Sequence, residues 1–138
     1  MSKLDIQDLA LKFLDSANID GFSFDCLIIP SEVEVLQITL NDLEEVSVYL
    51  SMTDEQILCI CYLWHEDEIN GSKKAELMET MLELNVPMPL SSFAKIGDRY
   101  TIFGALSSQS TFDDIAHEVV VLVENAVEAM AALEGYLK

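Results

Sequence analysis

The sequence has 138 residues, and its 25 acidic and 7 basic side chains give a formal net charge of −18. This charge repels phosphate backbones and anionic lipid headgroups, so we expect neither nucleic-acid binding nor direct insertion into a membrane. The hydrophobic fraction of 51% is ample for a buried core, and the length fits a single domain over residues 1–138.

The first half of the sequence predicts one helix followed by strands. Apolar residues recur at helical period in the first segment, and the turn residues Asn41 and Asp42 separate two of the strands. In the third strand Ser47, Tyr49 and Ser51 alternate with apolar residues, whereas the fourth strand is apolar on both faces, as is typical of the centre of a sheet. These elements are a helix at 3–17 and strands at 23–29, 33–40, 46–52 and 56–64.

The second half predicts two further helices and a hairpin. Gly97 and Asp98 provide the turn of the hairpin, and Thr111 is a candidate cap for the last helix. At 1.5 Å per residue the last helix would be roughly 37 Å long, which exceeds the width of a domain of this size. These elements are a helix at 72–85, a connector at 86–92, strands at 92–96 and 100–107, and a helix at 111–136.

The order of elements is a helix, three or four strands, a helix, two strands and a helix (αβββαββα). It predicts an α+β fold, with helices packed on a mostly antiparallel sheet. No apolar run reaches about 18 residues, so we expect no membrane-spanning helix. An odd number of cysteines and an N-terminus without a secretory pattern indicate free thiols in the reducing cytoplasm.

Cys59 and Cys61 are the first candidates for chemistry. Residues two apart on a strand point to the same side, so both thiols could approach a metal together with His65. Structural zinc sites need four ligands, and the sequence has no second cluster of ligands, so we expect no metal and no cofactor. The favoured interpretation is that both cysteines are small buried residues of a central strand. A metal- or redox-responsive protein that uses these three residues is the alternative.

No catalytic motif occurs in the sequence. The nucleophile elbow, the phosphate-binding loop and the dinucleotide fingerprint are all absent. His117 is next to Glu118 but far in sequence from any cysteine, and a catalytic histidine needs both a nucleophile and an orienting partner. We therefore expect that the protein is not an enzyme.

The last helix and the connector before the hairpin are the candidate partner-binding segments. The helix carries apolar residues beyond its core-facing stripe, which a helix with one wet side does not need. The alternatives are a wide core-facing stripe for the helix and a rigid crossover for the connector. The surplus of apolar residues favours a homodimer. The candidate partner-binding residues are Met88 and Leu90 in the connector and Val120, Val121, Ala129 and Ala132 in the helix.

Three segments resemble the YjfI family of bacteria, a domain of unknown function. They are MTDEQILCICYLWHEDE (52–68), AELMETMLELNVPMPLSSFAKIGDRYTIFGALS (75–107) and FDDIAHE (112–118). The resemblance implies an uncharacterised cytosolic protein. The genes of this family tend to lie near one for a phage-shock, PspA-like protein, which points to envelope maintenance.

The order of elements also resembles the fold of type III secretion chaperones and of YbjN-like proteins. Those chaperones are small, acidic and dimeric, and they bind extended segments of their partners. The resemblance carries no catalytic residues. It implies a chaperone-like or adaptor module that binds a protein partner.

Overall fold

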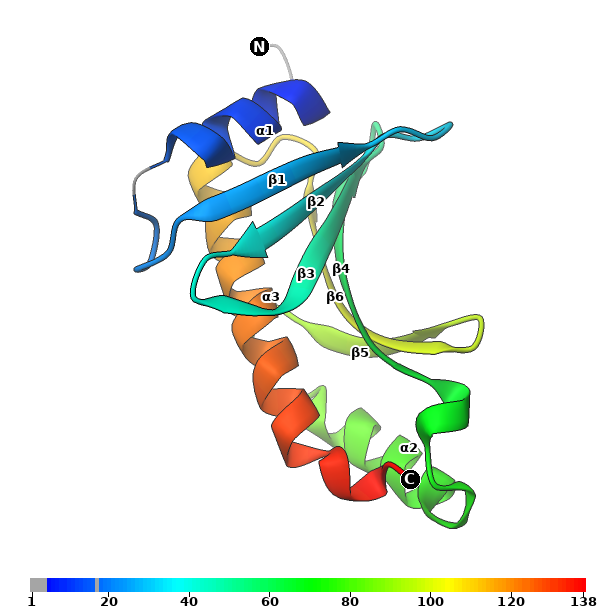
Figure 1. Cartoon of the computed structure of the whole chain (residues 1–138). Coiled ribbons are helices and arrows are strands. Elements are labelled where there is room, and N and C mark those ends of the chain that lie inside the picture. Colours follow the sequence, from blue (N-terminus) through cyan, green and yellow to red (C-terminus); the bar gives the residue numbers. More distant parts are fainter. Residues whose placement is uncertain (1–4, 17) are drawn as a thin grey trace.

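A computed structural model describes residues 5–16 and 18–138 of the chain, and it shows one antiparallel sheet with helices (Figure 1). The predicted α+β class is confirmed, and four strands lie between the first two helices. The helices are α1 (Ile6–Asp15), α2 (Lys74–Leu84) and α3 (Phe112–Ala132); the strands are β1 (Phe24–Ile29), β2 (Val35–Leu40), β3 (Leu43–Met52), β4 (Gln56–His65), β5 (Ser92–Ile96) and β6 (Arg99–Ser107).

The six strands lie in the order β1-β2-β3-β4-β6-β5, and all neighbours are antiparallel. Both predicted hairpin turns are present: Leu40 pairs with Leu43 across Asn41 and Asp42, and Ile96 pairs with Arg99. The positive φ of Asp42 (74°) and of Gly97 (59°) is the left-handed backbone that two-residue hairpins require.

Helices cover one face of this sheet. Helix α1 packs on β1 and β2, and α3 packs on β3, β4 and β6. Figure 1 shows α3 running behind the strands, so the face toward the viewer has no helix on it. We call the helix-covered face the inner face and the opposite face the outer face.

Helix α1 begins at a capping box. The Asp5 side chain accepts a hydrogen bond from the Asp8 backbone N–H at 2.7 Å, and the Asp8 carboxylate accepts one from the Asp5 N–H. Phe13 anchors the helix by edge contacts with Phe24 of β1 and Phe112 of α3. The predicted helix at 3–17 extended beyond both observed ends, and its residues 3, 4 and 17 lie outside the described part of the chain.

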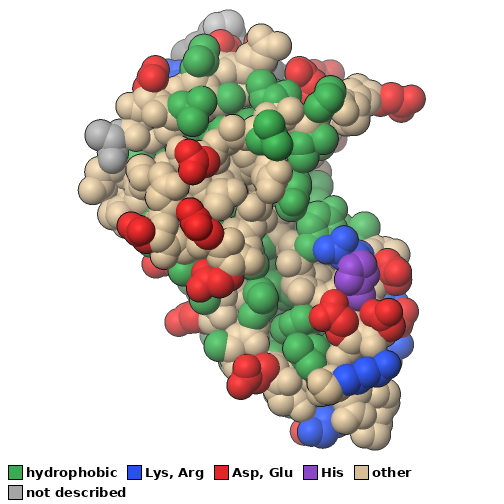
Figure 2. All heavy atoms as spheres, viewed as in Figure 1, with side chains coloured by type: hydrophobic (Ala, Val, Ile, Leu, Met, Phe, Trp, Pro, Cys, Tyr) green, Lys and Arg blue, Asp and Glu red, His purple; other side chains and the backbone are tan. Residues whose placement is uncertain are grey.

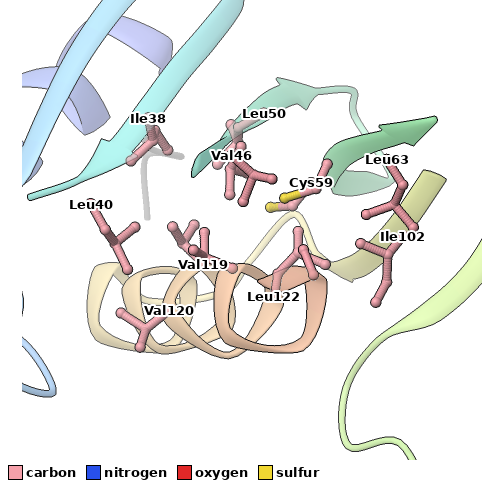
Figure 3. Close-up of a cluster of buried hydrophobic side chains, with 14 of the residues drawn as sticks. Ile38, Leu40, Val46, Leu50, Cys59, Leu63, Ile102, Val119, Val120 and Leu122 are labelled. Atoms are coloured by element: carbon pink, nitrogen blue, oxygen red, sulfur yellow. The ribbon is translucent and has the colours of Figure 1, made fainter. Parts of the chain in front are cut away.

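The core lies between the inner face and α3 (Figure 3). Leu50 and Cys59 point from the sheet, and Val119 and Leu122 point from the helix. All four side chains are fully buried. Alternate residues of β3 and β4 therefore contribute to the core, and the sequence predicted this alternation for β3.

Helix α3 is shorter than predicted. The Thr111 hydroxyl caps it by accepting from the Asp114 N–H at 3.2 Å, as expected. Its 21 residues correspond to about 31 Å, and a 3₁₀ turn at Glu134–Tyr136 follows in place of the last predicted turn. None of the helices in the described part of the chain has the length and apolar character that crossing a membrane requires.

Candidate functional site

The sheet is split between β3 and β4. These strands pair only over Tyr49–Met52 and Ile57–Ile60. Residues 43–48 of β3 and 61–65 of β4 have no partner across this boundary, and the two strands diverge from their common turn (Figure 1). We call the space between the diverging strands the β3–β4 cleft.

The β3–β4 cleft has a volume of about 710 Å³ and opens on the outer face. Figure 2 shows a hollow between the two halves of the molecule, with hydrophobic side chains along it. The residues that line the cleft come from five strands and from α3. They are Ile29, Val35, Glu44, Glu45, Val46, Ser47, Tyr49, Ser51, Ile60, Tyr62, Leu63, Arg99 and Met130.

Two tyrosines and an arginine form a stack in this cleft. The rings of Tyr49 and Tyr62 meet edge to face, with centroids 5.6 Å apart. The Arg99 guanidinium lies 4.5 Å from the centroid of the Tyr62 ring, a distance at which a cation is attracted to an aromatic face. The Nε atom of Arg99 is buried and has no hydrogen-bond partner among the described residues.

The backbone along the cleft resembles two open sheet edges that face each other. The register between β2 and β3 skips from Leu43 to Val48, so residues 44–47 also lack a regular partner in β2. Unpaired N–H and C=O groups of a strand are a template for pairing with another extended segment. Together with the apolar lining, they suit main-chain recognition of a peptide.

A second apolar depression lies between α3 and the connector. Its volume is about 650 Å³. The Asn125 side chain holds the connector against α3, because its amide donates to the Pro89 carbonyl and to the Ser91 hydroxyl, both at 3.0 Å. We call this depression the α3 groove. It is lined by Leu84, Pro87, Met88, Pro89, Phe93, Asn125, Glu128, Ala129, Ala131 and Ala132.

The α3 groove brings together three of the predicted partner-binding residues, Met88, Ala129 and Ala132. Leu90 is 55% exposed and has a positive φ of 62°, and it does not line the groove. Val121 is half-buried on α3.

Val120 does not belong to a surface, contrary to the prediction. It is only 2% exposed and lies in the core. Helix α3 packs on the sheet and also contacts α1 near its N-terminal end, where Phe112 meets Phe13. A helix packed on two sides buries a wider arc than the single stripe that the sequence analysis assumed.

The alternative metal hypothesis does not fit the structure. Cys59 and Cys61 are fully buried on the inner face. A β-bulge between Tyr62 and Trp64 shifts the register, so that His65 pairs with Arg99 and lies on the opposite, outer side. Within the described residues, no three histidine, cysteine, aspartate or glutamate side chains are placed to hold a metal ion. Burial raises the pKa of Cys61 to about 12, so its thiol is protonated at neutral pH.

Two titratable side chains of α3, His117 and Glu118, line neither the β3–β4 cleft nor the α3 groove. The Nδ1 atom of His117 lies 2.8 Å from Oδ2 of Asp20. The hydrogen bond between these two side chains raises the pKa of the imidazole. Glu118 is 5% exposed and packs against Gly104 of β6, where a Cβ atom would overlap its carboxylate. Desolvation by this burial raises the pKa of Glu118.

The comparison with family models decides the family. The description "Uncharacterized protein conserved in bacteria (DUF2170)" matches residues 3–137. The chain belongs to this family. The proteins called Uncharacterized protein YjfI in Escherichia coli K12 and O157:H7 are each 28% identical to it over 131 residues, which cover 92% of this chain and 91% of theirs.

Two solved structures share the fold of this family member. One is a chain of the heterodimeric ExoU–SpcU complex from the type III secretion system of Pseudomonas aeruginosa, with a TM-score of 0.58, 13% identity, and coverage of 95% of this chain and 99% of that chain. The other is YbjN from E. coli, with a TM-score of 0.57, 16% identity, and coverage of 92% and 96%. At these identities the similarity shows the fold.

Sequence reasoning missed the cleft residues. Tyr49 was placed on the polar side of its strand, and Tyr62 and Arg99 were given no role. The one signal for them was the fourth strand, which is apolar on both faces although the helices cover only one.

Proposed function

We propose that this protein is a chaperone-like or adaptor module that binds an extended segment of another polypeptide in the β3–β4 cleft. Its role is binding rather than catalysis, and its place is the cytoplasm. The single observation that carries the proposal is the split sheet. Residues 43–48 and 61–65 form two facing strand edges without partners across the cleft.

The lining of the cleft supports an extended occupant. Addition of a strand to an open edge gives main-chain hydrogen bonds, and alternate side chains of that strand enter pockets on one face. Ile60 and Tyr62 supply an apolar floor, and Ser47 and Ser51 supply small polar neighbours. The ExoU–SpcU chain with the same fold forms a heterodimeric protein complex, which agrees with a protein as the partner.

A peptide-display selection with a library of random 15-residue peptides tests the proposal. We expect selected peptides to protect the amides of residues 43–48 and 61–65 from hydrogen exchange. Glu45→Pro removes a backbone donor at the open edge and should weaken these peptides about tenfold, the cost of one or two hydrogen bonds. Glu45→Gln, which changes the same side chain but keeps the donor, is the matched control.

A second variant keeps the test informative if the proline disturbs the fold. Ser51→Lys places a long charged side chain on the outer face at the cleft, away from the core, and should also weaken binding. Peptides that protect other segments and bind both variants as tightly as the wild type would refute the proposal, as would a selection that yields no binder.

The α3 groove supports the predicted homodimer. Of its ten lining residues only Glu128 is charged, whereas the whole chain carries a net charge of −18. Two copies repel each other least where acidic residues are sparse. We therefore assign this groove, with Met88 and Ala132, to self-association, whereas the predicted partner-binding residue Ala129 is only 7% exposed and belongs to the core beneath the groove.

Light scattering during size exclusion tests the dimer. The exposed Ala132 of each copy would lie in the interface, so Ala132→Glu should shift a dimer to monomer, and added salt should strengthen the wild-type dimer by screening repulsion. Ala132→Ser is the control. A wild-type monomer at micromolar concentration, or a dimer that Ala132→Glu leaves intact, would rule this interface out.

A further inference from the structure

Within the described part of this strongly acidic chain, Arg99 has no carboxylate partner. Lys74 and Lys95 both contact Glu66, the latter at 3.2 Å, whereas Lys12 contacts the Phe112 ring and Lys73 donates to the Gly135 carbonyl. Among the residues that the structure describes, no ion pair includes Arg99, although the chain has 25 acidic side chains. Its guanidinium instead lies over the Tyr62 ring.

The guanidinium of Arg99 keeps hydrogen-bonding capacity inside the cleft. Its Nε is buried without a hydrogen-bond partner, and buried donors without a partner are rare in folded proteins. The planar fork of a guanidinium matches a carboxylate with two parallel hydrogen bonds, and stacking on a ring fixes its plane beforehand. Arg99 lines the β3–β4 cleft, so such a ligand would reach it from there.

We propose that the segment bound in the β3–β4 cleft carries a carboxylate that pairs with Arg99. The inference rests on the proposed function and adds a chemical specificity to it. Glu44 and Glu45 line the same cleft from β3, so the part of the segment beside them is neutral or basic. The carboxylate belongs either to an aspartate or glutamate side chain or to the C-terminus of the partner.

A peptide selection with two libraries distinguishes these sources. One library carries a C-terminal amide and the other a free C-terminal carboxylate, and both contain the same random sequences. Enrichment of aspartate or glutamate at one position in the amidated library indicates a side chain. Binders that require the free C-terminus indicate the terminal carboxylate.

The variant Arg99→Gln then tests the contact on the selected peptides. We expect it to weaken the peptide with the carboxylate about tenfold to a hundredfold, the range for a charged hydrogen bond. It should leave unchanged the weaker affinity of the matched neutral peptide, in which glutamine or the amide replaces the carboxylate. Arg99→Lys keeps the charge but not the fork, and should recover only part of the affinity.

The outcomes separate this inference from the proposed function. Binders that protect the cleft but show no preference for a carboxylate, or that bind Arg99→Gln as well as the wild type, overturn the inference and leave the cleft as the binding site. If Arg99→Gln weakens the neutral and carboxylate peptides equally, Arg99 supports the shape of the cleft rather than recognising a charge, and the inference also fails. Absence of any cleft binder overturns both.

Discussion

Gly104 of β6 is the one of the five glycines at which an added Cβ atom would have neighbours within 4 Å. A Cβ atom there would overlap Oε1 of Glu118 and would lie 3.0 Å from the Leu90 carbonyl oxygen. Glu118 is 5% exposed and has little room to rotate away. The Leu90 backbone is held from both sides, because Asn125 donates to the Pro89 carbonyl and to the Ser91 hydroxyl.

The structure therefore places Gly104→Ala in the middle of the range for overpacked cores, at about 2 kcal/mol of lost stability. For a domain of this size that loss corresponds to a decrease of about 7 °C in the melting temperature. Urea unfolding followed by circular dichroism measures it. Gly135→Ala is the matched control, because nothing lies within 4 Å of its added Cβ, and its stability should change by less than about 0.5 kcal/mol.

A double-mutant cycle identifies the cause. Glu118→Ala removes the side chain that the new methyl group meets most closely and leaves only the Leu90 carbonyl contact, so in that background Gly104→Ala should cost about 1 kcal/mol or less. The coupling free energy between the two changes is then at least about 1 kcal/mol. Equal costs of Gly104→Ala in both backgrounds, or a cost as small as that of the Gly135→Ala control, would refute the packing argument.

Two further predictions concern buried groups. Burial raises the pKa of Glu118, so the folded protein binds the proton of this carboxyl group more tightly than the unfolded chain does. The protonated group therefore contributes stability below the ordinary pKa of 4.5, and this contribution is lost as the pH rises through the raised pKa. Glu118→Gln should thus become more stable relative to the wild type as the pH rises from 4.5 through the raised pKa in urea unfolding. A difference that is constant with pH would contradict the assignment. The Cys59 and Cys61 thiols are both fully buried, so they should react with a disulfide reagent only after unfolding, and fast reaction in the native state would show that the strand opens. Cys59→Ser should lower the stability by about 1–3 kcal/mol, because it buries a hydroxyl among apolar groups.

Local patterns in the sequence predict most of the fold. Asn41 and Asp42, Gly97 and the Thr111 cap are short-range signals whose physical causes lie within a few residues, and the structure confirms each of them. The ends of elements were less accurate, because they depend on neighbours that are distant in sequence. Strand β3, for example, begins at Leu43 rather than at the predicted residue 46.

The candidate site was much harder to predict. The cleft results from the point at which β3 and β4 stop pairing, and no residue in either strand marks that point. The bulge after Tyr62 moves His65 to the other face, so a ligand set inferred from strand alternation fails. In the same way the burial of Val120 depends on how α3 packs in the folded chain, which the helical period alone does not show.

Part of the surplus of apolar residues in this chain lies on the half-buried outer side of β4, whereas the most exposed large apolar side chains, such as Leu27, Leu82 and Val86, lie on other elements. Much of the excess on α3 is absorbed by the core, where Val120 and Ala129 are buried. Strand β4 buries Cys59 and Cys61 on the inner face, but it also carries Ile60 and Tyr62 on the outer face, where no described helix packs. A half-covered sheet usually alternates apolar and polar residues, as β3 does, and β4 does not. The second apolar face of β4 borders the cleft whose strand edges are unpaired, and a segment bound in that cleft, as proposed, would cover it.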